Sequence, residues 1–277
     1  MKIAVLSGKG GTGKTFVSVN LANVTGNATY IDCDVEEPNG HLFFKPDLIK
    51  EEPVYKKHPF FNKDLCSGCR KCVDFCQFNA LAFIGKAPIL FDEVCHSCEG
   101  CKIVCKDNAI QMEDFEIGVI QHGQAGNVTV LTGILNIGQA SGIPIIDKML
   151  TNCQSENVII DCPPGSACSV MDSIKGVDYC LLVAEPTVFG LHNLEMVYDL
   201  VKLMNKPCSI VLNKSNPNET LIHNFAKANS INIICEIPFS KKVANLTASG
   251  EISSNNSKEI AILFNDIIAK INMEVSI

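Results

Sequence analysis

Tryptophan is absent from this sequence of 277 residues, and all aromatic residues together make up only 6% of it. Proteins that bind single-stranded nucleic acid stack the bases on aromatic side chains, so the sequence offers few platforms for such binding. Basic residues are also in deficit, because 23 Lys and Arg stand against 30 Asp and Glu. The formal net charge of −7 therefore argues against nucleic acid and against an anionic membrane as partners.

Long hydrophobic runs are missing as well, although 47% of the residues are hydrophobic and can fill a sizeable core. No stretch reaches the roughly 18 apolar residues of a transmembrane helix. The first residues form a short apolar segment that leads into a glycine-rich loop, which is not the pattern of an export signal. We therefore expect a cytoplasmic protein, and in a reducing cytosol its 15 cysteines indicate metal binding rather than disulfide bonds.

The clearest motif is the glycine-rich loop itself, which lies between a predicted strand at residues 1–6 and a predicted helix at 16–22. It fits the phosphate-binding pattern G-x-x-x-x-G-K-[ST], which a chance turn would rarely match in full. Its glycines let backbone N–H groups turn toward a phosphate at the helix N-terminus. Lys14 is expected to contact the β- and γ-phosphates, and the Thr15 hydroxyl to ligate Mg²⁺. The predicted nucleotide contacts are Gly8, Gly10, Gly11, Thr12, Gly13, Lys14 and Thr15.

The letters K-G-G-T-G-K-T at Lys9–Thr15 resemble the deviant phosphate loop of the MinD/ParA/Mrp/nitrogenase-iron-protein superfamily. The resemblance implies ATP or ADP as the ligand. It also implies that Lys9 reaches the nucleotide of a partner subunit, so we expect a nucleotide-dependent homodimer. Without the resemblance, Lys9 could simply be a solvated loop lysine.

Acidic residues follow two further predicted strands and resemble the switch segments of the same superfamily. Residues 28–34 end in Asp32 and Asp34, which are similar to switch I. The resemblance implies that Asp34 activates the attacking water and that Asp32 holds the Mg²⁺ shell. Residues 157–161 lead into D-x-P-P-G, which is similar to switch II and implies a Mg²⁺-shell role for Asp161 and a γ-phosphate sensor in Gly165.

The C-terminal half continues to alternate predicted strands and helices. Strands are expected at 178–184, 208–214 and 231–237, and helices at 143–152, 191–204 and 259–272. The resemblance implies that Asn213 reads the adenine base and that Pro238 belongs to the loop that flanks it. A strand-end turn residue is the less favoured interpretation of Asn213. Cys168 lies close to predicted switch II and could report the nucleotide state to a metal centre, but we expect it to be an ordinary buried cysteine. The same expectation applies to Cys33, Cys153, Cys162, Cys180, Cys208 and Cys235.

Eight cysteines form two runs with the same spacing, C-x₂-C-x₂-C-x₃-C, related by an internal repeat of 29 residues. This is the run of bacterial ferredoxins, in which the fourth cysteine ligates the other cluster. One [4Fe–4S] cluster is therefore expected on Cys66, Cys69, Cys72 and Cys105, and the other on Cys95, Cys98, Cys101 and Cys76. Zinc is the rival interpretation. The proline that usually follows the run is replaced by Gln77 and Lys106.

The alternation of elements predicts an α/β fold with a doubly wound, mostly parallel sheet. We expect a P-loop ATPase domain at 1–52 plus 116–277, with an inserted α+β ferredoxin-like domain at 53–115. This combination resembles MinD-superfamily ATPases that carry an inserted ferredoxin domain. The leading hypothesis is an ATP-hydrolysing dimer that couples its cycle to electron transfer with an unidentified redox or client protein. The alternative is a carrier or maturation factor for an iron–sulfur cluster or a metal cofactor, and a positioning ATPase is a weaker alternative.

Overall fold

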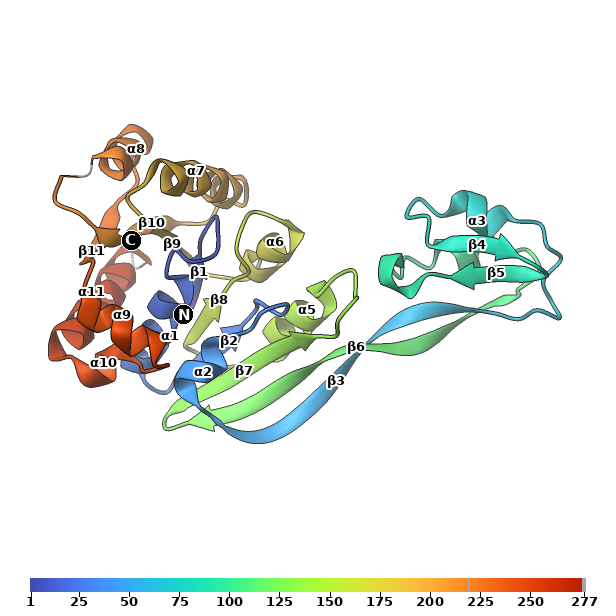
Figure 1. Cartoon of the computed structure of the whole chain (residues 1–277), viewed down its shortest axis with the longest axis horizontal. Coiled ribbons are helices and arrows are strands. Elements are labelled where there is room, and N and C mark those ends of the chain that lie inside the picture. Colours follow the sequence, from blue (N-terminus) through green and yellow to red (C-terminus); the bar gives the residue numbers. More distant parts are fainter. Residues whose placement is uncertain (219, 276–277) are drawn as a thin grey trace. The chain divides into compact units, whose positions relative to one another are not determined.

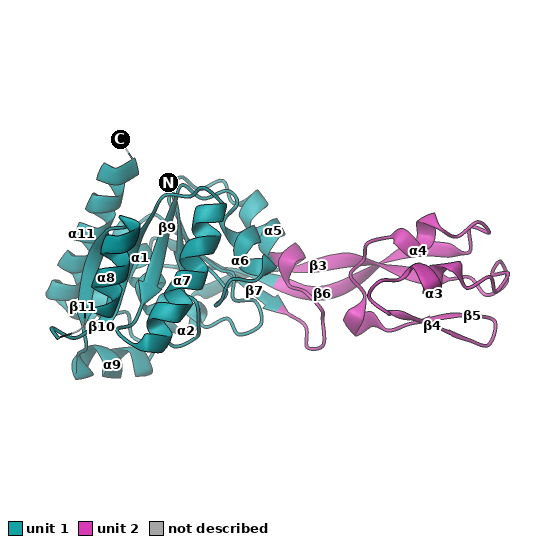
Figure 2. Cartoon of the chain, turned by 90° about the horizontal axis from the view of Figure 1, so that it is seen from above, with its two compact units in different colours: residues 1–51, 120–134, 146–277 teal, residues 52–119, 135–145 magenta. Residues whose placement is uncertain are grey.

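The computed structural model describes residues 1–218 and 220–275, and the chain divides into two compact units (Figure 2). Unit 1 comprises residues 1–51, 120–134 and 146–277, and unit 2 comprises 52–119 and 135–145. Two long strands, β3 (Asp47–Phe61) and β6 (Ile110–Ala125), each have one end in either unit. No helix among the described residues combines the length and apolarity that crossing a bilayer requires.

A sheet of nine strands in the order β11-β10-β9-β1-β8-β2-β7-β6-β3 forms the centre of unit 1 (Figure 1). The seven strands from β11 to β7 pair in parallel, which confirms the predicted sheet type. Strands β2, β8 and β9 are buried along their whole length, as expected when helices cover both faces of a parallel sheet. The strand bounds are β1 Lys2–Leu6, β2 Thr29–Asp32, β7 Val128–Leu135, β8 Val158–Asp161, β9 Tyr179–Ala184, β10 Cys208–Ser215 and β11 Ile233–Pro238.

Helices cover both faces of this sheet, with α7 and α8 on one side and α1 and α11 on the other (Figure 1). The core between α1, α11 and the sheet includes an edge-to-face contact of Phe16 with Phe264, at 5.7 Å between ring centroids. The predicted helix at 143–152 is confirmed with the same bounds. The helices are α1 Lys14–Thr25, α2 Gly40–Phe44, α5 Ile143–Asn152, α6 Cys168–Ile174, α7 Val188–Leu203, α8 Leu221–Asn229, α9 Lys241–Ala248, α10 Ser253–Asn256 and α11 Lys258–Val275.

The sequence pattern does not predict the strand β3. It runs over 15 residues, most of them exposed, and so lacks the alternating apolar pattern that predicts a strand. It also contains Pro53 and Pro59, which argue against a central strand. Its place at the end of the strand order explains both features, because an edge strand tolerates proline and solvent.

Unit 2 contains the two cysteine runs, and the sequence repeat is also a backbone repeat. Its elements are α3 Lys71–Phe75, the antiparallel hairpin β4 Leu81–Ile84 with β5 Ala87–Leu90, the 3₁₀ helix η1 Asp92–Val94, and α4 Gly100–Ile103. Helices α3 and α4 begin 29 residues apart. The left-handed backbone positions recur with the same spacing, in the pairs Gly68 and Ser97, Arg70 and Glu99, and Asn79 and Asn108.

The two halves of unit 2 also pair with each other in a reciprocal way. The Asn62 N–H donates to the Ala109 carbonyl, and the Phe91 N–H donates to the Ala80 carbonyl, both at 2.8 Å. Each of these four residues lies 29 positions from its counterpart in the other bond. Because left-handed backbone is uncommon outside glycine, this agreement means that both cysteine runs follow one backbone path.

Candidate functional site

The glycine-rich loop connects β1 to the N-terminus of α1, the local geometry that the sequence predicted for phosphate binding. Gly13 has a positive φ of 98°, and a Cβ there would lie 2.1 Å from the Asn213 amide nitrogen. A Cβ on Gly8 would lie 2.1 Å from the backbone oxygen of Asn193. At these two positions only glycine fits, so the loop is shaped by close packing as well as by φ.

Lys14 is buried at the start of α1 and is surrounded by acids. Its Nζ lies 2.6 Å from Asp161 Oδ1 and 3.9 Å from Asp34 Oδ2. Burial alone would lower the pKa of Lys14, but Asp161, Asp32 and Asp34 outweigh it and raise the pKa. Tyr30, also buried, donates its hydroxyl hydrogen to Asp161 Oδ2 at 2.8 Å. The Walker-type lysine and the switch II aspartate are therefore in direct contact.

Asp32 lies beside Asp161 in the parallel pairing of β2 with β8 and is fully buried. Its carboxylate accepts hydrogen bonds from the backbone N–H groups of Asp34, Asn39 and Gly40 at 3.2, 3.1 and 2.9 Å. Burial, and then the charge of Asp161, raise the pKa of Asp32 to about 7. Burial also raises the pKa of Asp34, to about 6. Asp32 thus fixes the start of the predicted switch I, and Asp34 is the more exposed of the two acids.

Lys9 forms an ion pair with Glu185 of the same chain. Glu185 also forms an ion pair with Lys214, whose Nζ lies 3.3 Å from Glu185 Oε2. The same Nζ donates a hydrogen bond to the Gly11 carbonyl at 2.8 Å. Burial would raise the pKa of Glu185, but hydrogen bonds from Lys9 and Lys214 outweigh it and lower the pKa. Sequence reasoning missed Glu185 and Lys214, although both lie at the carboxyl ends of parallel strands, where ligands bind.

The remaining predicted contacts also lie at this edge of the sheet. Asn213 is buried and donates its side-chain amide to the Thr12 carbonyl at 2.8 Å, so it supports the loop. The Gly165 N–H donates to the Ser7 carbonyl at 2.9 Å. Pro238 is exposed at the end of β11. Their proposed contacts with a base or with the γ-phosphate remain predictions.

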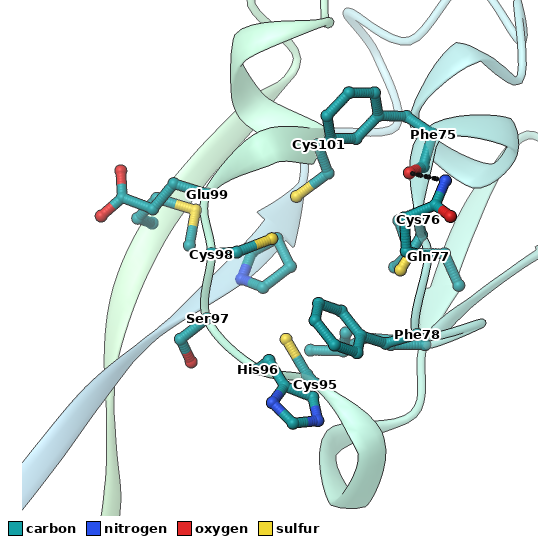
Figure 3. A pocket seen from close by; sticks show the side chains of 15 residues that line it. Phe75, Cys76, Gln77, Phe78, Cys95, His96, Ser97, Cys98, Glu99 and Cys101 are labelled. Carbon is teal, nitrogen blue, oxygen red and sulfur yellow. Dashed lines mark hydrogen bonds between the residues drawn. The ribbon is translucent and has the colours of Figure 1, made fainter. Parts of the chain in front are cut away.

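Two cavities in unit 2 are lined by the eight repeat cysteines. Each cavity contains three cysteines of one run and one cysteine of the other run. Cavity A is lined by Cys66, Cys69, Cys72 and Cys105. Cavity B is lined by Cys76, Cys95, Cys98 and Cys101, and is drawn in Figure 3. These are the two sets that the ferredoxin spacing predicted.

Both cavities have apolar walls, with Phe61 and Phe83 beside cavity A and Phe75 and Phe78 beside cavity B. Burial first, and then the neighbouring cysteines, raise the pKa of the Cys101 thiol to about 11, against a hydrogen bond from the Lys102 backbone that lowers it.

The single cysteine near switch II differs from its prediction. Cys168 begins α6 and is exposed, whereas we expected it to be buried. Of the other six cysteines outside the runs, Cys33, Cys153, Cys162 and Cys180 are buried as expected, and Cys208 and Cys235 are half-buried. The error arose because a cysteine at a helix start gives no periodic signal of the face that it occupies.

The strand–loop–helix, the buried lysine and the strand-end acids define the class of P-loop ATPases. A family model described as "CobQ/CobB/MinD/ParA nucleotide binding domain" matches residues 3–253, and the chain belongs to that family. It is 36% identical over 271 residues to an uncharacterized protein of Methanocaldococcus jannaschii, MJ0578, covering 95% of each chain. A second protein of that organism, MJ0579, is 28% identical over 267 residues, covering 91% of this chain and 90% of the other.

Solved structures with the same fold include the cell division ATPase MinD of Pyrococcus furiosus, at 19% identity and a TM-score of 0.61 over 98% of each chain. The septum site-determining protein MinD of Pyrococcus horikoshii, solved with Mg-ADP, has 18% identity and a TM-score of 0.59, covering 98% of this chain and 95% of the other. At these identities the likeness shows the fold alone. The fold is thus MinD-like, and the chain is an ATPase of this family.

Proposed function

We propose that this protein is an iron–sulfur ATPase, which binds ATP as a homodimer and couples its ATP cycle to electron transfer through two [4Fe–4S] clusters. The observation that carries the proposal is the division of the eight cysteines into two cavities, each lined by three from one run and one from the other. That division follows the ligand rule of two-cluster ferredoxins. A redox or client protein would supply or receive the electrons.

The residues of both cavities fit a cluster. The walls contain phenylalanine and other apolar side chains, which shield a cluster from water. Among the described residues, no three His, Cys, Asp or Glu side chains are close enough to hold one metal ion. A four-iron cube separates its four ligands more widely than a single tetrahedral zinc ion does, so an open cavity is the form that a cluster requires.

The ATP site is proposed on Gly8, Gly10, Gly11, Thr12, Gly13, Lys14 and Thr15. Lys14 would exchange its contact with Asp161 for the β- and γ-phosphates. Asp161 would then be free, with Thr15 and Asp32, to hold the shell of a Mg²⁺ ion, which neutralises phosphate charge when bound. Asp34 would orient the attacking water, and the Gly165 N–H would exchange the Ser7 carbonyl for the γ-phosphate.

The first prediction concerns metal content. Anaerobically purified protein is expected to contain about eight iron and eight sulfide per chain. Cys72→Ser removes a ligand of cavity A and is expected to disturb one cluster far more than the other, with up to about half of the iron lost. The matched control is Cys168→Ser, an exposed cysteine outside the runs, which should leave the iron content unchanged. Stoichiometric zinc without acid-labile sulfide would overturn the cluster assignment.

The second prediction concerns coupling. Strands β3 and β6 connect the two units, so ATP binding near switch I is expected to alter the reduction equilibrium of the clusters. By thermodynamic reciprocity, reduction must change the ATP affinity by the same factor. A coupling of about 1.4 kcal/mol would be a tenfold change. The measurement is the Kd for ATP of oxidised and dithionite-reduced protein, and equal values would exclude equilibrium coupling.

A carrier that delivers a cluster is the second candidate function. Cys69 and Cys98, at repeat-related positions, are exposed, which would allow an acceptor to approach a ligand. The two functions differ in the fate of iron. If holo-protein incubated with ATP and an apo-acceptor loses iron to it, the carrier function holds; if all iron stays while electrons pass, the relay holds.

A further inference from the structure

We infer that the two clusters are unequal and that the cluster of cavity A accepts the first electron, because Arg70 and Lys71 line that cavity. The inference rests on the proposed function. The charged residues beside each cavity set the order of reduction, and the repeat within unit 2 allows equivalent positions of the two cavities to be compared.

The repeat gives matching backbone conformations to equivalent positions beside the two cavities, so the charges at those positions can be compared directly. Arg70 and Glu99 are repeat-related and have φ of 60° and 58°. The next positions are Lys71 and Gly100, which begin α3 and α4. The first half of the repeat therefore has two cationic side chains at these positions, whereas the second half has one glutamate and one glycine.

Arg70 is held beside cavity A by an aromatic contact. Its guanidinium carbon lies 5.0 Å from the centroid of the Phe83 ring, and both residues line the cavity. A cation over an aromatic face is attracted by the ring quadrupole. Asp107 lines the same cavity and accepts a hydrogen bond from Ser67, so the charged lining of cavity A comprises two cations and one anion.

Cavity B has Glu99 in its lining, and in Figure 3 the Glu99 carboxylate points away from the cysteines. One cation acts on this side, because Lys56 donates to the Cys95 carbonyl at 3.2 Å. Asp92 and the Cys95 thiolate both act electrostatically on Lys56, so its charge is partly balanced. Counted over the lining residues alone, cavity B carries one negative charge, on Glu99, and cavity A carries a net charge of one positive.

Reduction adds one electron to an oxidised cluster and makes its net charge more negative by one. A nearby cation stabilises the reduced form and a nearby anion destabilises it, which is one of the ways a protein sets cluster potential. The electron comes from a one-electron donor, which is dithionite in the test below. With one electron per chain, it therefore resides in cavity A.

The test is a spectroscopic redox titration of the full-length holo-protein, with two charge reversals at matched positions. Arg70→Glu gives cavity A the glutamate that cavity B has at the equivalent position, where the backbone conformation is the same. Glu99→Arg gives cavity B the arginine of cavity A. Arg70→Glu is expected to lower the equilibrium constant of the first reduction about tenfold, which is 59 mV for one electron. Glu99→Arg is expected to raise that of the second reduction.

Both shifts should shrink as salt is raised above about 0.1 M, because Arg70 is exposed and Glu99 is half-buried, so ions in solution screen both charges. Arg70→Gln and Lys71→Gln provide milder variants should a reversal impair folding. If Arg70→Glu moves the second wave, or neither wave, while the protein retains both clusters, the inference is wrong and the proposed function stands. If wild-type protein binds no iron and sulfide, the proposed function fails together with the inference.

Discussion

Lys14→Ala is expected to lower the affinity for MgATP by at least about 100-fold, or roughly 2.7 kcal/mol. Lys14 is the buried cation at the N-terminus of α1, and charge-assisted bonds to phosphate are among the strongest polar contacts. The measurement is calorimetric titration with MgATP. The matched control is Lys227→Ala, an exposed lysine on α8. Unchanged affinity in Lys14→Ala would refute the assigned phosphate site.

The same variant should show a characteristic dependence of stability on pH. Without Lys14, Asp32 and Asp161 are two neighbouring buried carboxylates that have lost their nearby cation, which raises the pKa of Asp32 further. In wild type the pKa of Asp32 is already raised to about 7 from an ordinary value near 3.8. A raised carboxyl pKa means that the folded state binds more protons, so stability falls as pH rises from about 4 through 7. Lys14→Ala should therefore lose more stability at pH 8 than at pH 5, by denaturant titration, and Lys14→Met should behave alike.

The ATP site could be predicted in most of its residues because parallel strands end at one edge of a sheet. Asp32 and Asp161 end the paired strands β2 and β8, and Lys14 begins the helix that follows β1 and the glycine-rich loop. The contact between Lys14 and Asp161 follows from that topology. The ion pair of Lys9 with Glu185 could not be predicted, because the phosphate-loop motif specifies the lysine but not the acid with which it pairs.

The cysteine sets of unit 2 could be predicted from spacing, whereas the strand β3 could not. A run of C-x₂-C-x₂-C-x₃-C determines which thiols can lie together, and the two cavities have that division. The strand β3 has no such pattern, because it is stabilised by backbone pairing with β6 and exposes most of its side chains. The difference in charge between Arg70 and Glu99 was readable in the sequence, but only the shared backbone showed that the two positions are equivalent.

Lys9→Ala is expected to abolish ATP-dependent dimerisation and to reduce hydrolysis by a factor on the order of 10³, the effect typical of a cation supplied in trans. The affinity of the monomer for ATP should remain nearly that of wild type. Lys9 and Glu185 are both half-buried, and Glu185 keeps its ion pair with Lys214 when the Lys9 side chain is removed, so no buried charge is left without a partner. The variant should therefore fold normally. Steady-state ATPase assays and light scattering with and without ATP measure both effects.

Mixing two inactive variants then decides whether Lys9 acts across the dimer. Lys9→Ala subunits bind ATP but lack the lysine, and Lys14→Ala subunits keep Lys9 but bind no ATP. If Lys9 acts in trans, the mixed dimer regains hydrolysis. ATP is then bound by the Lys9→Ala subunit, and the Lys14→Ala subunit supplies Lys9 to it. If Lys9 acts within its own chain, the mixture stays inactive.

Glu185→Gln is expected to lower the ATP concentration needed for dimerisation. The substitution removes the carboxylate that pairs with Lys9, so Lys9 no longer has to break an ion pair before it can reach the partner subunit.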